Sequence, residues 1–90
     1  MLKIVASNQF RKDLKLAKKR RFKLEHLKEV VDTLAARQPL DEKYRDHNLT
    51  GNYRGFRECH IEPDRLLIYR IEDDELELFL FRTGTHSDLF

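Results

Sequence analysis

Residues 53–82 read YRGFRECHIEPDRLLIYRIEDDELELFLFR, and this stretch decides the fold. It contains three runs typical of β-strands, at 53–62, 66–72 and 75–82. Turn-forming pairs, Pro-Asp and Asp-Asp, separate these runs. Connections this short join antiparallel neighbours, so the stretch predicts a three-stranded meander. Because apolar residues occur on both sides of the strands, we expect both faces of the sheet to be covered, one by the helices, with a bound partner as a candidate cover for the other.

Two helices are predicted upstream of the meander. Residues 2–6 read as a short strand, and the serine and asparagine that follow offer a cap for a basic amphipathic helix over 8–21. A second apolar stripe at helical spacing predicts another helix over 24–37, which Pro39 ends. Two consecutive helices with a short join pack as a hairpin on one face of a sheet.

The remaining segments are short or polar. Residues 40–51 lack periodicity and predict a long connection, while residues 83–90 allow a turn or one helical turn. Ninety residues leave room for one core, so a single domain is expected over 1–90. The predicted fold class is α+β, a small antiparallel sheet with two N-terminal helices packed on one face, in the order β-α-α-β-β-β.

Positive charge is concentrated in the first third of the chain. Residues 1–28 carry ten Lys or Arg against two acidic residues, whereas residues 29–90 carry eight against fourteen. A basic block on a folded domain favours a polyanionic partner, either nucleic acid or an acidic protein segment. A solvated helix face would carry the same charges, so the charge pattern alone leaves both interpretations open. The candidate RNA- or ribosome-binding residues of this block are Lys12, Lys15, Lys18, Lys19, Arg20 and Arg21.

Composition gives no sign of export, membrane insertion or a cofactor. Residues 1–10 lack the apolar run of a signal peptide, and no stretch approaches the ~20 apolar residues of a membrane span. Cys59 is the only cysteine, so we expect it in the core of a protein in the reduced cytoplasm. His60-Ile61-Glu62 has the form of the zinc deaminase motif without its paired cysteines, so neither a metal nor a cofactor is expected.

Four polar side chains meet at one edge of the predicted sheet. The first meander strand ends near His60 and the third at Arg82, while Asp64 lies in the first turn and His86 follows the third strand. RNA carries its own nucleophile, the 2′-OH, and histidine moves protons near neutral pH. Arginine can bind two phosphate oxygens at once. The cluster therefore predicts a ribonuclease site.

Each of these residues also has a purely structural explanation. A surface histidine can be inert, Arg82 can pair with Asp88, and Asp64 can serve only the turn. His47 precedes the first meander strand by six residues, so the topology does not bring it to the cluster. His26, on the second predicted helix, is expected to be structural. The functional interpretation therefore depends on the residues occurring together.

The motifs in this region resemble those of a known family. The stretch from His47 to Asp64, which ends in His-Ile-Glu-Pro-Asp, and the Arg-Thr-Gly-Thr-His motif ending at His86 closely resemble the YafQ branch of the RelE/ParE toxin superfamily. The resemblance covers essentially the whole chain. It implies a toxin of a bacterial type II toxin–antitoxin module, which cuts mRNA in the ribosomal A site without a metal, with adenine-rich lysine codons often preferred. The catalytic surface that it implies comprises His47, His60, Asp64, Arg82, His86 and Phe90.

The resemblance also suggests roles for these residues. His86 is expected to be the general acid for the 5′-oxygen, with Asp64 or His60 assisting deprotonation of the 2′-OH. Arg82 would hold the scissile phosphate, His47 would position the RNA, and the C-terminal aromatic ring would stack on a base. The basic helices would contact ribosomal RNA independently of sequence.

One position departs from the family pattern. Relatives carry an aromatic residue, usually tryptophan, after the Pro-Asp pair, and this chain has Arg65. An arginine there could stack on a base or bind a phosphate. Two hypotheses remain open, natural variation or a substitution that lowers toxicity.

Alternative functions follow from the same superfamily. A binding inhibitor of the gyrase-poisoning kind would not need the His, Asp and Arg cluster, and a catalytically silent antitoxin- or DNA-binding module is a third possibility. The expected partners are the ribosome with its mRNA and a cognate antitoxin. An acidic antitoxin segment would lie across the basic helices or the exposed sheet edge. Operator DNA would be reached only through the antitoxin, and no membrane partner is expected.

Overall fold

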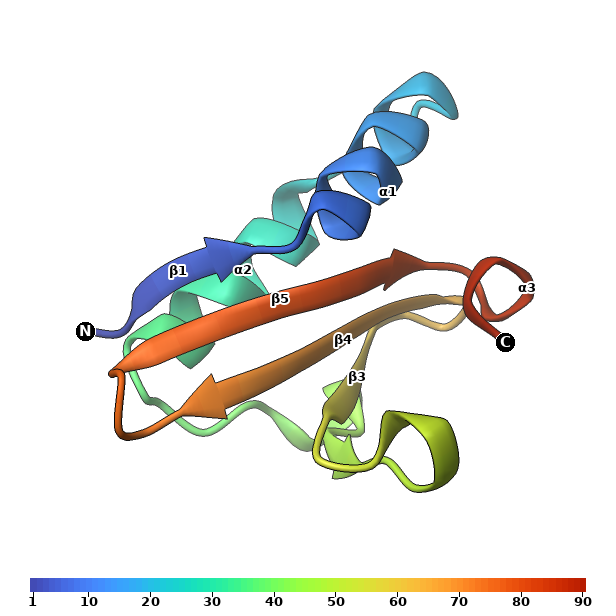
Figure 1. The fold of residues 1–90 in the computed structure, drawn as a ribbon. Coiled ribbons are helices and arrows are strands. Elements are labelled where there is room, and N and C mark those ends of the chain that lie inside the picture. The colour runs from blue at the N-terminus through green and yellow to red at the C-terminus, as the bar shows by residue number, and fades with distance from the viewer.

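The computed structural model describes residues 1–90, which form one five-stranded sheet in the order β1-β5-β4-β3-β2 (Figure 1). The strands are β1 (Lys3–Ala6), β2 (His47–Asn48), β3 (Arg57–Glu62), β4 (Arg65–Glu72) and β5 (Glu77–Gly84). The α-helices are α1 (Asn8–Lys19), α2 (Glu25–Ala35) and α3 (His86–Leu89), and the 3-10 turns are η1 (Glu42–Tyr44) and η2 (Gly51–Tyr53). None of the helices has the length and apolar character that a membrane span requires.

The sheet is mixed rather than wholly antiparallel, which corrects the predicted fold. Strands β3, β4 and β5 form the antiparallel meander that the turns predicted. Strand β1 instead pairs with β5 in parallel, from Lys3 opposite Glu77 to Ala6 opposite Leu80. A parallel pair needs a long crossover between its strands, and the helices and the meander supply it here. The N-terminal strand therefore forms one edge of the sheet, beside the last strand.

The two long helices pack on one face of the sheet, as predicted. Helix α1 begins after Ser7, whose side-chain oxygen accepts a hydrogen bond from the backbone N–H of Phe10 at 2.9 Å. Both helices end two residues before their predicted limits. Arg21 and Arg37 follow them with left-handed backbone conformations, φ 59° and 57°, which an α-helix cannot continue.

One core of 14 buried residues lies between these helices and the sheet. Phe10 of α1 and the Leu27 face of α2 meet Leu67 of β4 and Leu78 of β5 there. Cys59 is fully buried in this core, as predicted, and burial raises the pKa of its thiol to about 12. The thiol is therefore protonated at neutral pH and is a poor nucleophile.

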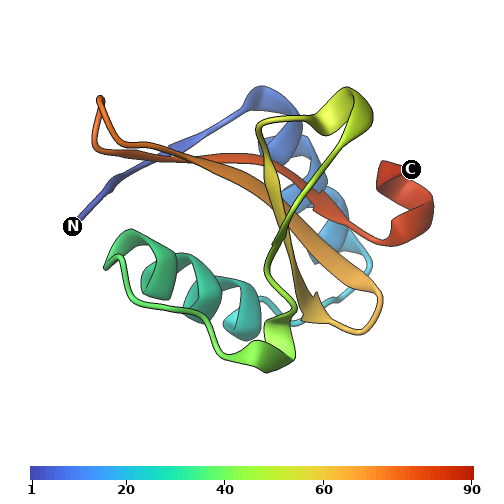
Figure 2. The same ribbon diagram turned by 90° about the horizontal axis from the view of Figure 1, so that it is seen from below.

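The opposite face of the sheet is partly covered by the chain itself. The strand predicted over 53–62 begins only at Arg57, because the preceding residues form η2 and a turn at Gly55 with φ 93°. Figure 2 shows η2 and α2 on opposite sides of the strands. The ring of Phe56 stacks on Phe81 with 4.5 Å between their centroids. A second, smaller cluster results, formed by Leu66, Ile68 and Leu89 with Leu49, Tyr53, Phe56 and Phe81 packed against it.

Strand β5 continues beyond its predicted end at Arg82, to Gly84. The β4–β5 register shifts between Ile68 and Tyr69, where β5 contains one extra residue. Beyond this bulge the Thr83 hydroxyl donates a hydrogen bond to the Leu66 carbonyl at 2.7 Å. The end of β5 is thereby fixed beside the start of β4, so α3 emerges next to the β3–β4 turn.

Candidate active site

The best-defined polar pair of the site joins the β3–β4 turn to α3. Nδ1 of His86 lies 2.9 Å from Oδ1 of Asp64, and the His86 backbone N–H donates to the same oxygen at 3.2 Å. An ionised carboxylate only accepts hydrogen bonds, so Nδ1 carries a proton and Nε2 remains available for exchange. Donation from the His86 ring, and then from its backbone, lowers the pKa of the Asp64 carboxyl. The topology predicted this meeting, and the structure confirms it.

Three imidazole rings form a row across the end of the sheet. The ring of His60 on β3 lies 5.9 Å from that of His86 and 6.3 Å from that of His47, measured between centroids. His47 reaches the row because β2 pairs with β3, with His47 opposite Glu58. This two-residue strand lies inside the segment that we expected to be a connection. The structure therefore brings His47 together with His60 and His86, whereas the strand pattern of the sequence placed only His60 and His86 at this edge.

A buried carboxylate lies beneath two of these rings. Glu58 is 5% exposed, and its Oε1 is 3.5 Å from Nε2 of His47 and 3.7 Å from Nε2 of His60. Nδ1 of His47 is held by the Arg45 carbonyl at 2.7 Å, which directs Nε2 toward the carboxylate. The sequence analysis missed Glu58. The signal was its position two residues before His60, because alternate residues of a strand share a face.

Aromatic rings close one side of the site. The exposed ring of Phe90 lies 5.3 Å from that of Tyr53 and 6.4 Å from that of His86, between centroids. The Tyr53 hydroxyl donates to the Leu89 carbonyl at 3.1 Å, which ties η2 to α3. Tyr53 was also missed, because η2 was expected to be part of an unstructured connection and a strand. The two rings present faces and edges on which a base could stack.

Arg82 is paired with a carboxylate of α1. Its Nε and Nη2 donate to the Asp13 carboxylate of α1 at 2.8 and 3.1 Å, and the Thr83 backbone N–H donates to Asp13 at 3.1 Å. The hydrogen bond to Asp13 raises the pKa of Arg82. The pairing with Asp88 that the sequence left open is wrong. The structure therefore does not bring Arg82 into contact with the histidines, and only Nη1 lacks a protein partner.

Helix α3 is fixed by a capping network. Thr85 and Asp88 form a capping box, in which each side chain accepts a hydrogen bond from the backbone N–H of the other. Arg20, predicted to contact RNA, instead donates to Asp88 at 2.9 Å. The Thr85 backbone and then Arg20 lower the pKa of the Asp88 carboxyl. Because His86 is the first residue of α3, this network sets the position of the imidazole.

The rest of the predicted basic surface is exposed on and just after α1. None of these five side chains forms an ion pair within the chain, so their charges are available to an anionic partner. Asp13 lies on the buried side of the same helix and is committed to Arg82. The exposed residues are Lys12, Lys15, Lys18, Lys19 and Arg21.

Arg65 does not belong to the exposed surface. It is 8% exposed, and its guanidinium lies over the Phe22 ring, 4.6 Å from the centroid. Its Nη1 donates to the Lys23 carbonyl at 2.9 Å and to Oε2 of Glu62 at 3.2 Å. The prediction that Arg65 contacts RNA conflicts with this placement. Its stem packs inward because residue 65 is the first of the central strand β4 rather than part of the turn.

The titratable side chains of the site form an acid–base row. No group of three or more His, Cys, Asp or Glu side chains is arranged to hold a metal ion. The exposed Asp64 carboxylate orients the imidazole of His86. The imidazoles of His47 and His60 lie beside the buried Glu58 carboxylate. Groups of this kind can take a proton from one oxygen and give a proton to another across a bound phosphate.

Several solved structures share this fold, and bacterial toxins are among them. A crystal structure of a metal-bound toxin from Helicobacter pylori matches with a TM-score of 0.94 and 52% identity over 100% of both chains. The crystal structure of the Escherichia coli DinJ-YafQ complex matches with a TM-score of 0.90 and 42% identity, over 100% of this chain and 99% of that one. The fold and site therefore define a small bacterial toxin of this structural class.

The sequence comparisons identify the family. The family model for YafQ, a bacterial toxin of type II toxin–antitoxin systems, matches residues 2–90. The mRNA interferase toxin YafQ of Escherichia coli K12 is 44% identical over 85 residues, which is 93% of this chain and 90% of that protein. The chain belongs to the YafQ family of type II toxins, as the resemblance implied.

Proposed function

We propose that this chain is the toxin of a type II toxin–antitoxin module and inhibits translation as an endoribonuclease that cuts mRNA in the ribosomal A site. The single observation that carries the proposal is the His86–Asp64 pair, 2.9 Å long, at one end of a row of three imidazoles. The similar Escherichia coli protein is named an mRNA interferase toxin, which supports the same activity here.

The proposed reaction uses the 2′-OH of the RNA as the nucleophile. The 2′-oxygen attacks the adjacent phosphorus while a base takes its proton, and the bond from phosphorus to the 5′-oxygen breaks as an acid protonates that oxygen. The products are a 2′,3′-cyclic phosphate and a free 5′-hydroxyl. His86 gives the proton from Nε2. Asp64 fixes the ring and stabilises its charged form through Nδ1.

His60 is the better candidate for the base. Asp64 is occupied by two hydrogen bonds from His86, and its lowered pKa makes it a weak proton acceptor. The rings of His60 and His86 lie 5.9 Å apart between centroids, close enough for both to reach oxygens of one phosphate bound over them. The Glu58 carboxylate, 3.7 Å from Nε2 of His60, would stabilise the imidazolium that forms when His60 takes the proton.

The other predicted site residues bind rather than react. His47, fixed between Glu58 and the Arg45 carbonyl, positions the RNA, and Phe90 stacks on a base. Arg82 contributes positive charge through a guanidinium that Asp13 already orients, so its contact with the phosphate is limited to the remaining N–H groups.

The proposed partners follow from the charged surfaces. The exposed basic residues of α1 give sequence-independent contacts to ribosomal RNA, and the ribosome presents the mRNA to the histidine row. An antitoxin with an acidic segment covers the same basic surface, and a complex with DinJ exists for the Escherichia coli relative. Such a module acts in the cytoplasm and reaches operator DNA only through the antitoxin.

The deciding experiment is primer extension on a defined mRNA in a purified translation system. We expect wild type to cut within codons in a ribosome-dependent manner and His86→Gln to lose the cuts, because glutamine keeps a hydrogen bond to Asp64 without a transferable proton. Lys28→Ala is the control, since Lys28 is exposed on α2 and paired only with Asp32. Growth inhibition by His86→Gln without cleavage would favour a binding inhibitor instead.

A further inference from the structure

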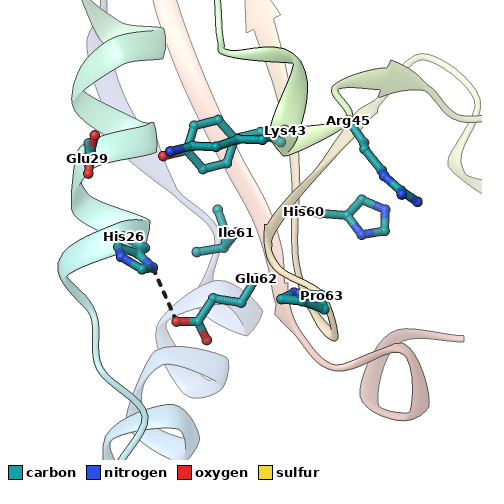
Figure 3. Close-up of a pocket in the computed structure, with 9 residues that line it drawn as sticks. His26, Glu29, Lys43, Arg45, His60, Ile61, Glu62 and Pro63 are labelled. Carbon is teal, nitrogen blue, oxygen red and sulfur yellow. Dashed lines mark ion pairs between the residues drawn. The ribbon is translucent and has the colours of Figure 1, made fainter.

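A cleft of about 480 Å³ lies beside the histidine row and is lined in part by His60 (Figure 3). Three segments bound it: α2, the η1 turn with Arg45, and the end of β3. Its volume falls within the range of about 300–1,000 Å³ that is usual for small-molecule sites. No residue that lines it, apart from His60, belongs to the predicted site. The lining residues are His26, Glu29, Lys43, Tyr44, Arg45, His60, Ile61, Glu62 and Pro63.

The cleft is continuous with the acid–base row because the edge of β3 is open there. Strand β2 pairs only with Arg57 and Glu58, so the later residues of β3 have no strand neighbour on that side. His60 lines both the cleft and the row. Figure 3 shows Arg45 and His60 on one side of the β3 edge, and Glu62 and His26 facing each other on the other side. A strand of RNA whose phosphate lies at His60 can therefore continue over this edge into the cleft.

Glu62 is fixed inside the cleft by a buried cation. Its Oε2 accepts a hydrogen bond from Nη1 of Arg65 at 3.2 Å, and Arg65 is itself held by the Lys23 carbonyl and the Phe22 ring. Its Oε1 lies 3.3 Å from Nδ1 of His26. The carboxylate thus has a defined orientation, with Oε1 directed into the cleft toward α2. Arg65 is in this sense a positioning residue for Glu62.

The distribution of charge separates a phosphate side from a base side. Lys43 and Arg45 bring cations from η1 and its C-terminal neighbour, whereas Glu62 and Glu29 bring carboxylates from the two opposite walls. Carboxylates repel phosphate but accept hydrogen bonds from the exocyclic amino groups of bases. Apolar atoms of Ile61 add a surface for the face of a ring.

We propose that this cleft binds the nucleobase adjacent to the scissile bond, with Glu62 accepting a hydrogen bond from an exocyclic amino group; the proposal rests on the proposed RNA-cleaving function. Adenine, cytosine and guanine carry such a group, whereas uracil presents a carbonyl oxygen that a carboxylate repels. Arg45 binds the phosphate that neighbours the scissile one along the strand. The cleft thereby selects the sequence at the cut.

Binding can be tested without catalysis by titrating the ¹⁵N-labelled chain with AMP, CMP and UMP. We expect the backbone amide signals of residues 43–45 and 60–62 to shift with AMP and CMP, and to shift less with UMP. Glu62→Gln, which keeps the shape of the side chain, should remove the difference between the nucleotides. Lys28→Ala, on α2 but outside the cleft, should retain it. Equal responses to all three nucleotides, or shifts confined to Tyr53 and Phe90, overturn the proposal.

A second measurement links the cleft to cleavage. Four mRNAs that differ only in the base next to the cut are compared in the purified translation system. We expect wild type to cut the amino-bearing sequences about tenfold faster than the uracil sequence, and Glu62→Gln to cut all four at similar rates. If wild type cuts all four mRNAs at the same rate, the proposal that the cleft binds a base is overturned, whereas the proposed nuclease function is not. If wild type cuts none of the four mRNAs, the proposed function fails, and the nucleotide titration alone decides whether the cleft binds a nucleobase.

An acidic protein segment is the main competing occupant of the cleft. A synthetic acidic peptide is therefore titrated in parallel with the nucleotides. If the peptide shifts the cleft amides and the nucleotides do not, the cleft is a protein contact and the proposal is overturned. If Glu62→Gln responds to AMP and UMP as wild type does, Glu62 does not read the base and the proposal is likewise overturned.

Discussion

Two carboxylates of this chain each hold a cationic or titratable side chain of the C-terminal segment, in contrasting surroundings. Asp13 is buried between α1 and β5 and binds Arg82 and the Thr83 N–H. Asp64 is exposed in the β3–β4 turn and binds His86. A buried charge left without its partner is costly, whereas water readily solvates an exposed one. The buried pair therefore fixes structure, and the exposed pair can change its protonation during a reaction.

A third pair lies between these two in exposure. The guanidinium of Arg65 is buried, but its partner Glu62 opens into the cleft beside the histidine row. Arg65 also satisfies the Lys23 carbonyl at the join between the helices. The comparison suggests that a pair with one buried and one exposed member serves both stability and binding. Substitutions at the three pairs should therefore differ in what they damage.

The largest loss of stability is expected at Asp13. Asp13→Ala leaves Arg82 and the Thr83 N–H without their acceptor beneath β5, which should lower the free energy of unfolding by about 3 kcal/mol. Urea denaturation followed by circular dichroism measures the change. Asp64→Ala is the matched control and should shift the urea midpoint much less than Asp13→Ala while abolishing cleavage. Equal effects of the two substitutions on the midpoint would remove the contrast between the pairs.

A smaller loss of stability is expected at Arg65. Arg65→Trp removes the hydrogen bonds to the Lys23 carbonyl and to Glu62, which should cost about 1–2 kcal/mol of unfolding free energy. Arg65 makes no contact with the histidine row, so cleavage of the uracil-bearing mRNA, which does not depend on Glu62, should proceed at the wild-type rate. Matching rates support natural variation at this position. A faster Arg65→Trp protein would instead support the hypothesis that Arg65 lowers toxicity.

The cap of α3 should affect the position of His86 more than global stability. Asp88→Ala removes the capping box and the contact with Arg20, a loss of about 1 kcal/mol that is confined to the last turn. We expect faster amide hydrogen exchange in residues 86–89 and a lower cleavage rate. Arg20→Ala should produce the same changes at smaller size. Unchanged cleavage in Asp88→Ala would show that the His86 position does not depend on the cap.

The exposed Asp64–His86 pair should be detected more clearly by titration of Asp64 than by the free energy of unfolding. The pKa of Asp64 is lowered by His86, so the pair favours the folded state above the ordinary aspartate pKa and loses this contribution as pH falls through the lowered value. NMR of the Asp64 carboxyl carbon should give a midpoint below 3.8, and His86→Ala, which keeps the backbone N–H of residue 86, should raise the midpoint toward that value. An unchanged midpoint in His86→Ala would mean that the hydrogen bond is absent in solution.

The sequence predicted the local parts of this protein well. Turn residues at Pro63 and Asp73 determined the antiparallel meander, and apolar spacing determined both long helices, because these signals act over a few residues. The same turns brought His60, Asp64 and His86 to one end of the sheet. The family resemblance added His47 and Phe90, which the topology alone did not place.

Contacts between distant segments were decided only by the tertiary structure. Strand β1 pairs with β5, Asp13 pairs with Arg82, and Arg20 pairs with Asp88, in each case across more than 60 residues. No short-range rule selects one acidic partner among sixteen for a given arginine. The choice depends on which faces the packed helices present to the strands.

The composition and spacing of the chain thus determined its fold class, its basic helix and the part of the acid–base row formed by His60, Asp64 and His86. Tertiary structure decided which charges are free and which are already used: Arg82, Arg20 and Arg65 are held by carboxylates, and Glu58 is placed beneath two histidines. The physical reason is that the sequence specifies which side chains are charged, whereas the burial and pairing of those side chains depend on how segments far apart along the chain pack together.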